Sequence, residues 1–206
     1  MGLAEFKLFI TMKKIIVLII TVLSLSSLSY SQNVRVDKYD VEDSTRVVLS
    51  YWKNFYTEWS TAASFSVGYA VNKNGLYLWQ LDVCLNEGKI QISKGRKMLL
   101  KFDDDSILEL ENSTEIGPGD YKYDVSKYGT TYYVYPSYSI TEEQIQKIIS
   151  GNVIKVRIEH EVGFVDREIK GVKKKSPKSR FSEGMEQLYT DVKAASQQTK
   201  NIRDNF

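Results

Sequence analysis

The chain has 206 residues, of which 42% are hydrophobic and 12% aromatic, and it carries a formal net charge of +2 with one cysteine and one histidine. A single cysteine excludes an internal disulfide, and one cysteine with one histidine excludes a metal site built from such ligands. The charge is too small to indicate nucleic-acid binding, and no sequence motif indicates a cofactor.

The N-terminal segment has the pattern of a secretory signal peptide. Met12-Lys13-Lys14 precedes the mostly apolar run 15–25, and the small residues Ser29 and Ser31 stand before Gln32. We predict cleavage before Gln32 and an exported protein, periplasmic or extracellular, with Met12 as an alternative start. A retained membrane anchor is the alternative, but the run is shorter than the ~20 residues of a spanning helix, so we expect no transmembrane segment after cleavage.

Charge and composition divide the rest of the chain. Residues 32–206 contain 25 basic and 25 acidic residues, but segment 170–206 alone carries nine basic and four acidic ones. We therefore predict a β-rich domain over 32–169, a basic exposed linker over 170–180 and a C-terminal helix over 181–206.

Short strands are predicted along the first half of the domain. Val34–Val41 fits a strand, and 46–52 fits one too, although a short helix would suit the pattern through Trp59 nearly as well. Alternating apolar residues in 64–71 and 76–85, separated by Asn72–Gly75, predict a long antiparallel hairpin with one apolar face.

A second set of turns follows this hairpin. Ile90 and Ile92 suggest a short strand, and Lys97–Phe102 should pair with Ile107–Glu111 across an aspartate-rich connection. The three consecutive acids 103–105 suit a hairpin turn better than a calcium loop, with Asp105 in the left-handed conformation.

The stretch from Tyr138 to Ile169 predicts a strand, a helix and a hairpin. Thr141 and Gln144 have capping-box spacing at the start of a helix over about 141–150, and Gly151 is expected to end it in the left-handed conformation. Residues 153–160 follow as a half-buried strand, paired with 162–169. In this strand the side chains of Ile154, Val156 and Ile158 are expected to face the core.

These patterns together predict a mainly β fold, an antiparallel sheet or β-sandwich with one short helix and a C-terminal amphipathic helix; an α+β fold is the alternative. The C-terminal helix should run from about Ser182 to Ile202, with apolar residues spaced alternately by four and three. Docking on the chain's own sheet is the favoured interpretation. The alternative is a partner-binding helix that uses Phe181, Met185, Leu188 and Val192.

A tyrosine-rich tract is the best candidate binding site. Seven tyrosines occur between Tyr121 and Tyr138, and tyrosine gives a large amphipathic contact area at low entropic cost. The competing explanation is strand propensity and cross-strand packing. The candidate residues for a partner or ligand are Tyr121, Tyr123, Tyr128, Tyr132, Tyr133 and Tyr135.

Catalytic signatures are weak. Cys84 and His160 could in principle act as nucleophile and base, but Cys84 lies inside a predicted strand, out of phase with its core row. We name no catalytic residue, and an unrecognised pair of carboxylates in a hydrolase remains an alternative.

Part of the chain resembles a known layout. A "Lys-Gly … Leu-Leu-Lys-Phe-Asp-Asp" hairpin at 94–104, a "Tyr-Ser-Ile-Thr-Glu-Glu-Gln" helix start at 138–144 and "Lys-Val-Arg-Ile" at 155–158 are similar to those of small exported β-rich bacterial proteins of unknown function. Asp105 stands where those proteins usually have glycine. The resemblance implies a β-rich exported domain and no activity.

The expected function is a non-catalytic protein-binding or structural module of the cell envelope, with another envelope protein as its partner. The alternative is binding of a glycan or other envelope component on the tyrosine face.

Overall fold

A computed structural model of the chain describes residues 34–39, 45–58, 61–72, 77–117, 120–126, 129–169 and 179–203. All of them belong to one compact unit that begins at Val34. The predicted signal peptide and nearly all of the predicted basic linker lie outside the described residues.

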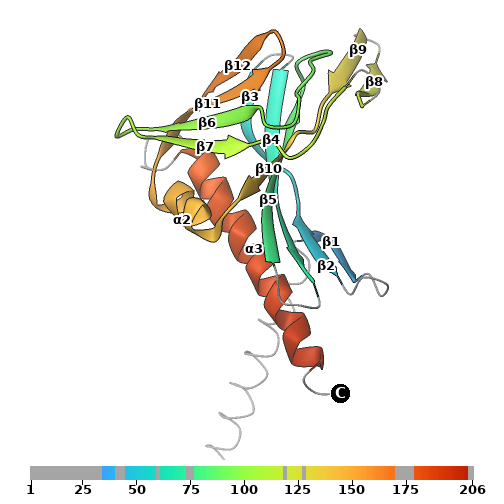
Figure 1. Cartoon of the computed structure of the whole chain (residues 1–206), viewed down its shortest axis with the longest axis vertical. Helices are drawn as coiled ribbons and strands as arrows, with labels where there is room; N and C mark the ends of the chain where they lie inside the picture. The colour runs from blue at the N-terminus through green and yellow to red at the C-terminus, as the bar shows by residue number, and fades with distance from the viewer. Residues whose placement is uncertain are drawn as a thin grey trace, which may run out of the picture. The chain divides into compact units, whose positions relative to one another are not determined.

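The fold is mainly β, with antiparallel sheets and two described helices, of which one is C-terminal (Figure 1). None of the described helices has the length and apolarity to cross a membrane. The strands are β1 Val34–Tyr39, β2 Arg46–Ser50, β3 Lys53–Glu58, β4 Thr61–Val71, β5 Tyr77–Leu85, β6 Lys97–Phe102, β7 Ile107–Glu111, β8 Lys122–Ser126, β9 Gly129–Tyr133, β10 Ser137–Ile140, β11 Val153–His160 and β12 Gly163–Glu168. The helices are α2 Glu142–Ser150 and α3 Arg180–Arg203.

Two larger sheets form the body. One has the order β1-β2-β4-β5-β10 with β3 also on β4, and the other has the order β12-β11-β6-β7. They meet where an isolated bridge joins Asn112 to Tyr138 and the Ser113 backbone amide donates to the Ser137 carbonyl at 2.7 Å. Strands β8 and β9 form a separate two-stranded hairpin.

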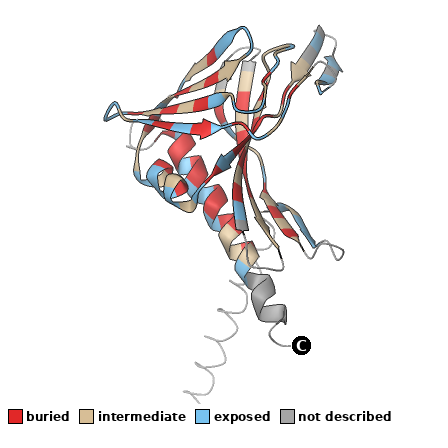
Figure 2. Cartoon of the chain, in the orientation of Figure 1, coloured by how far each residue is buried: buried red, intermediate tan, exposed pale blue. Residues whose placement is uncertain are grey.

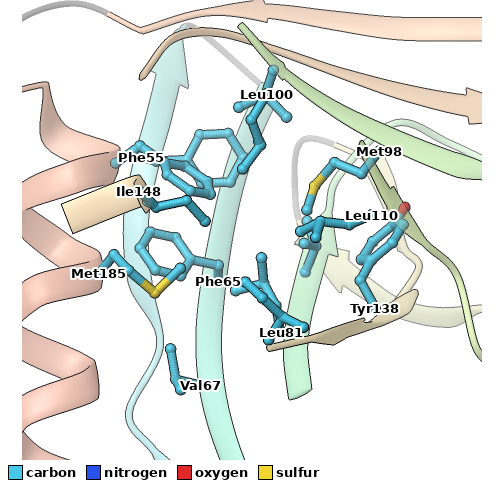
Figure 3. Close-up of a cluster of buried hydrophobic side chains, with 14 of the residues drawn as sticks. Phe55, Phe65, Val67, Leu81, Met98, Leu100, Leu110, Tyr138, Ile148 and Met185 are labelled. Carbon is cyan, nitrogen blue, oxygen red and sulfur yellow. The ribbon is translucent and has the colours of Figure 1, made fainter. Parts of the chain in front are cut away.

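The hydrophobic core lies between these sheets and the helices. Phe181 of α3 stacks on Phe65 of β4, with ring centroids 4.5 Å apart, and meets Phe55 of β3 edge-on at 5.2 Å. Figure 3 shows Phe55, Phe65 and Met185 in this cluster, and the buried face of α3 is visible in Figure 2. Helix α3 is therefore part of the domain's own core.

Several local predictions are confirmed. Strands β4 and β5 pair over nine residues, from Ala63–Leu85 to Val71–Tyr77, and β6 pairs with β7 across a turn in which Asp105 has a φ of 65°. The Thr141 side chain accepts from the Gln144 amide at 3.2 Å, and Gln144 Oε1 accepts from the Thr141 amide at 2.8 Å, so the capping box is formed.

The ambiguous stretch 46–59 is extended rather than helical within its described part. Strand β4 has 11 residues, enough for β2 to pair with its C-terminal half and for β3 to pair with its N-terminal half. Ile90 and Ile92, in contrast, do not form the predicted strand. Only Ile92 pairs, through a single bridge to Ile116.

Gly151 does not adopt the predicted left-handed conformation. Its φ is −88° and its ψ is −177°, which is extended backbone that any residue can adopt. Glycine is needed there for space, because a Cβ atom would lie 2.6 Å from the Phe102 ring and 2.9 Å from the Lys147 carbonyl oxygen. The sequence therefore marked the helix end correctly for the wrong reason.

Ile154 does not face the core as predicted. Its side chain is 37% exposed, whereas Val153 is fully buried. The register against β6 shifts between Val153 and Lys155, so a β-bulge inserts one residue and changes the face that follows. Val156 and Ile158 beyond the bulge are buried, as expected.

The apolar seam of α3 lies against the chain's own sheets. α3 contacts α2 and the strands β1 to β4, as the favoured interpretation of the seam expected. A helix that binds a partner through its apolar seam would need the seam side chains to leave the core. The four buried candidates of the partner-binding alternative are Phe181, Met185, Leu188 and Val192.

Candidate binding surface around the β8–β9 hairpin

The β8–β9 hairpin projects from the body, as Figure 1 shows. Its strands pair only with each other among the described residues, with Tyr123 opposite Tyr132 and Lys122 opposite Tyr133. Thr130, Thr131 and the tyrosines favour extended backbone, which explains why the segment forms strands. An isolated two-stranded ribbon is marginally stable, so the stability of this hairpin depends on side chains that contact the body.

One face of the hairpin carries tyrosines, and we call it the tyrosine face: Tyr121, Tyr123, Val125 and Tyr132, together with Lys89. Tyr132 lies at the centre, with ring centroids 6.5 Å from Tyr121 and 6.4 Å from Tyr123. Lys89 Nζ lies 4.8 Å from the Tyr132 ring centroid. Tyr123 is 68% and Val125 is 67% exposed, so two large apolar side chains are open to solvent side by side on one strand.

A second group of side chains, two rings and two cations, lies where the hairpin meets the main sheet. We call it the tryptophan cluster, and it consists of Arg35, Trp52, Lys122 and Tyr135. Trp52 and Tyr135 meet edge-on with centroids 5.9 Å apart. Arg35 Cζ lies 5.1 Å from the Trp52 centroid, and Lys122 Nζ lies 4.9 Å from the Tyr135 centroid. Because side chains alternate along a strand, Lys122 lies on the opposite hairpin face from Tyr123.

Tyr135 is also hydrogen-bonded to the thiol of Cys84. Partial burial, followed by the nearby thiol, raises the pKa of Tyr135 to about 12. Burial likewise raises the pKa of Cys84. Both groups are therefore neutral near pH 7, and the thiol has none of the activation that a nucleophile needs.

The structure distributes the predicted tyrosines over different environments. It brings Tyr121, Tyr123 and Tyr132 together, places Tyr135 in the tryptophan cluster and leaves Tyr133 half-buried. Tyr128 lies outside the described residues. Tyr138, the seventh tyrosine of the tract, is fully buried in the core.

Sequence reasoning missed Arg35, Trp52 and Lys89. Each comes from a segment far along the chain from the tract. The pairing of β1 with β2, of β2 and β3 with β4 and of β4 with β5, together with the bridge between Leu85 and Val134, brings them close. An isolated tryptophan or lysine in an ambiguous segment gives no local signal of such a cluster.

The candidate catalytic and metal-binding residues lie in different parts of the fold. The thiol of Cys84, on β5 of the first sheet, is hydrogen-bonded to Tyr135 and Ser64, whereas His160 is on β11 of the other sheet. Acids 103–105 form the turn, where Asp104 accepts from the Ser106 amide at 2.9 Å. Within the described part of the chain, no three histidine, cysteine or acidic residues are grouped to hold a metal.

Comparison of the chain with protein-family models, with curated proteins and with solved structures found no match in any of the three.

Proposed function

We propose that this chain is an exported, non-catalytic module that binds another protein of the cell envelope through its tyrosine face. The observation that supports the proposal is the pair of exposed side chains, Tyr123 and Val125, on a hairpin that projects from the body (Figure 1). Tyrosine is enriched where proteins bind each other, because its ring provides contact area and loses little rotamer freedom.

The arrangement favours a protein partner over a neutral sugar. Sugar rings stack on open aromatic faces, but Lys89 lies over the ring of Tyr132, the central tyrosine. The aliphatic side chain of Val125 beside Tyr123 suits an apolar side chain of a partner protein.

Site-specific cross-linking tests the proposal. A photo-reactive phenylalanine derivative replaces Tyr123 in the full chain, and the control carries it in place of Ile107, which is also exposed but lies on β7. We expect a discrete cross-linked protein in the cell envelope from position 123 only. The second variant, Val125→Asp, should remove that product while the melting temperature stays unchanged.

Equal cross-linking from both positions, or no protein product from position 123, would refute the proposal. A product that survives Val125→Asp would also refute it, because contact with this face requires an apolar surface.

A further inference from the structure

The tryptophan cluster contains two cations, and the described part of the chain places no carboxylate in an ion pair with either of them. Arg35 and Lys122 each lie over a ring instead. The acid on this part of β5, Asp82, instead accepts hydrogen bonds from Ser137 Oγ and Gln80 Nε2, both at 2.6 Å. The positive charges therefore remain available at the surface.

The outer face of the other sheet, β12-β11-β6-β7, gives a comparison, because charged side chains on it are paired with each other. Its basic side chains all have carboxylate partners: Lys97 with Glu109 at 2.5 Å, Lys101 with Asp105 at 2.7 Å, Lys155 with Asp166 at 2.7 Å, and Arg157 with Asp166 at 2.7 Å. Opposite charges paired across strands, or across a turn as for Lys101 and Asp105, stabilise an exposed sheet. The tryptophan cluster departs from this arrangement.

We infer that Arg35, Trp52, Tyr135 and Lys122 form a binding site for an acidic peptide segment, with the cations contacting carboxylates and the rings packing against the side chains between them. An exposed cation–π contact is worth about 0.5–1 kcal/mol, so Arg35 and Lys122 can turn toward carboxylates at little cost. The ring pair between them spans 5.9 Å from centroid to centroid. An extended peptide rises about 3.3 Å per residue, so carboxylates two to four residues apart can bracket it.

A peptide fits this cluster better than other polyanions. Two cations are too few to hold a nucleic-acid backbone, whose binding rests on many phosphate contacts. A polyuronate also carries carboxylates, but Trp52 and Tyr135 meet edge-on at an interplanar angle of 61°, so they do not present one flat aromatic face on which successive sugar rings could stack. The site shares the hairpin with the tyrosine face but uses different residues, so it stands independently of the function proposed above.

The experiment uses a random copolymer of glutamate and tyrosine as the probe, with polygalacturonate and a copolymer of lysine and tyrosine for comparison. Binding to the full chain is followed by tryptophan fluorescence, and Trp52→Phe identifies the part of the signal that comes from Trp52. We expect saturable binding of the acidic copolymer that weakens as salt increases. The double variant Arg35→Glu/Lys122→Glu should weaken it about tenfold.

The matched control is Lys38→Glu/Lys94→Glu, which changes the net charge equally at two exposed lysines outside the cluster. Its affinity should stay within about twofold of the unmodified chain, because screened charges at a distance contribute little. An equal loss in the control, tighter binding of polygalacturonate than of the acidic copolymer, or no binding of that copolymer would overturn the inference. Circular dichroism and melting temperature establish that both double variants are folded.

Discussion

Asn112 is buried at the junction of the two main sheets, where its amide connects three segments. Its Nδ2 donates to the carbonyls of Ile92, Ser93 and Thr114, at 3.3, 3.1 and 2.6 Å. Its Oδ1 accepts from the backbone amides of Thr114 and Ser137, both at 3.2 Å, and from the Thr114 hydroxyl at 2.8 Å. One side chain thus bonds backbone groups of three segments at the edges of the two sheets.

Replacing Asn112 should therefore destabilise the fold strongly. Asn112→Ala leaves buried donors and acceptors without partners, and we expect a loss of about 2–4 kcal/mol in the free energy of unfolding. Urea denaturation measures it, with Asn54→Ala on the exposed side of β3 as the control, expected within about 0.5 kcal/mol. A loss below about 1 kcal/mol at position 112 would mean that the network is not important for stability.

Gly151 and Gly95 should respond differently to the same substitutions. At Gly95 the φ is +88° and no atom lies within 4 Å of a Cβ, so alanine should cost about 1 kcal/mol and asparagine less. At Gly151 the backbone is unstrained but the Phe102 ring is in the way, so alanine should cost about 1–3 kcal/mol and asparagine at least as much. Denaturant midpoints of the four variants check this, and an asparagine at 151 better tolerated than alanine would contradict it.

Helix α3 is tied to the sheets along much of its length. Phe181 anchors its first turn against Phe55 and Phe65. Further along, Arg46 of β2 donates from its Nη atoms to the carbonyls of Ala195 and Ser196, both at 2.9 Å, while Asp37 of β1 accepts from the same guanidinium at 2.8 and 2.9 Å. The helix is thus held by apolar packing at one end and by a charged contact toward the other.

Shortening Phe181 tests whether the helix belongs to the core. Phe181→Ala removes a fully buried ring that stacks on Phe65, and we expect a loss of about 3–5 kcal/mol in the free energy of unfolding. Gln187→Ala, on the exposed side of the same helix, is the control and should cost less than about 1 kcal/mol. If Phe181→Ala unfolded with an unchanged midpoint, α3 would not be packed as described.

Carboxylates and tyrosines set opposite limits on the stability of the whole molecule. Hydrogen bonds from Arg157 lower the pKa of Asp166 to about 2, and those from Arg96 lower the pKa of Glu161 to about 2. Unfolded carboxyls have pKa values near 4, so the stabilisation is present above that pH and is lost as the pH falls toward 2. Tyr135 acts in the opposite direction: its pKa of about 12 exceeds the unfolded value of about 10, so stability falls as the pH rises above 10.

We therefore expect a stability plateau between about pH 5 and pH 9, with losses on both sides. Asp166→Asn should reduce the acid-side slope, since it removes one carboxylate that the folded state keeps ionised. Glu111→Gln, an exposed carboxylate of the same sheet, serves as the control. Chemical denaturation at a series of pH values measures the slopes, and an unchanged acid limb in Asp166→Asn would contradict the assignment.

Local patterns in the sequence were sufficient for most of the fold. The β4–β5 and β6–β7 hairpins follow from period-two alternation and turn residues, and the Thr141–Gln144 box follows from spacing within one helical turn. The apolar seam of α3 was predicted, and its docking on the chain's own sheet was the favoured interpretation. The hairpins, the capping box and the spacing of the seam depend on residues near each other in the chain, which is why sequence alone could determine them; the docking of α3 joins distant segments and was an interpretation of the seam.

The tertiary structure alone decided the features that depend on distant segments. The bulge at Ile154 reflects its register against β6, and the reason for Gly151 is the ring of Phe102, 49 positions away. Likewise, the tyrosine tract was visible in the sequence, but its division into the tyrosine face, the tryptophan cluster and the buried Tyr138 was not. Strand propensity specifies that a tyrosine is extended; which face it occupies and which cation covers its ring depend on sheet pairing across the whole chain.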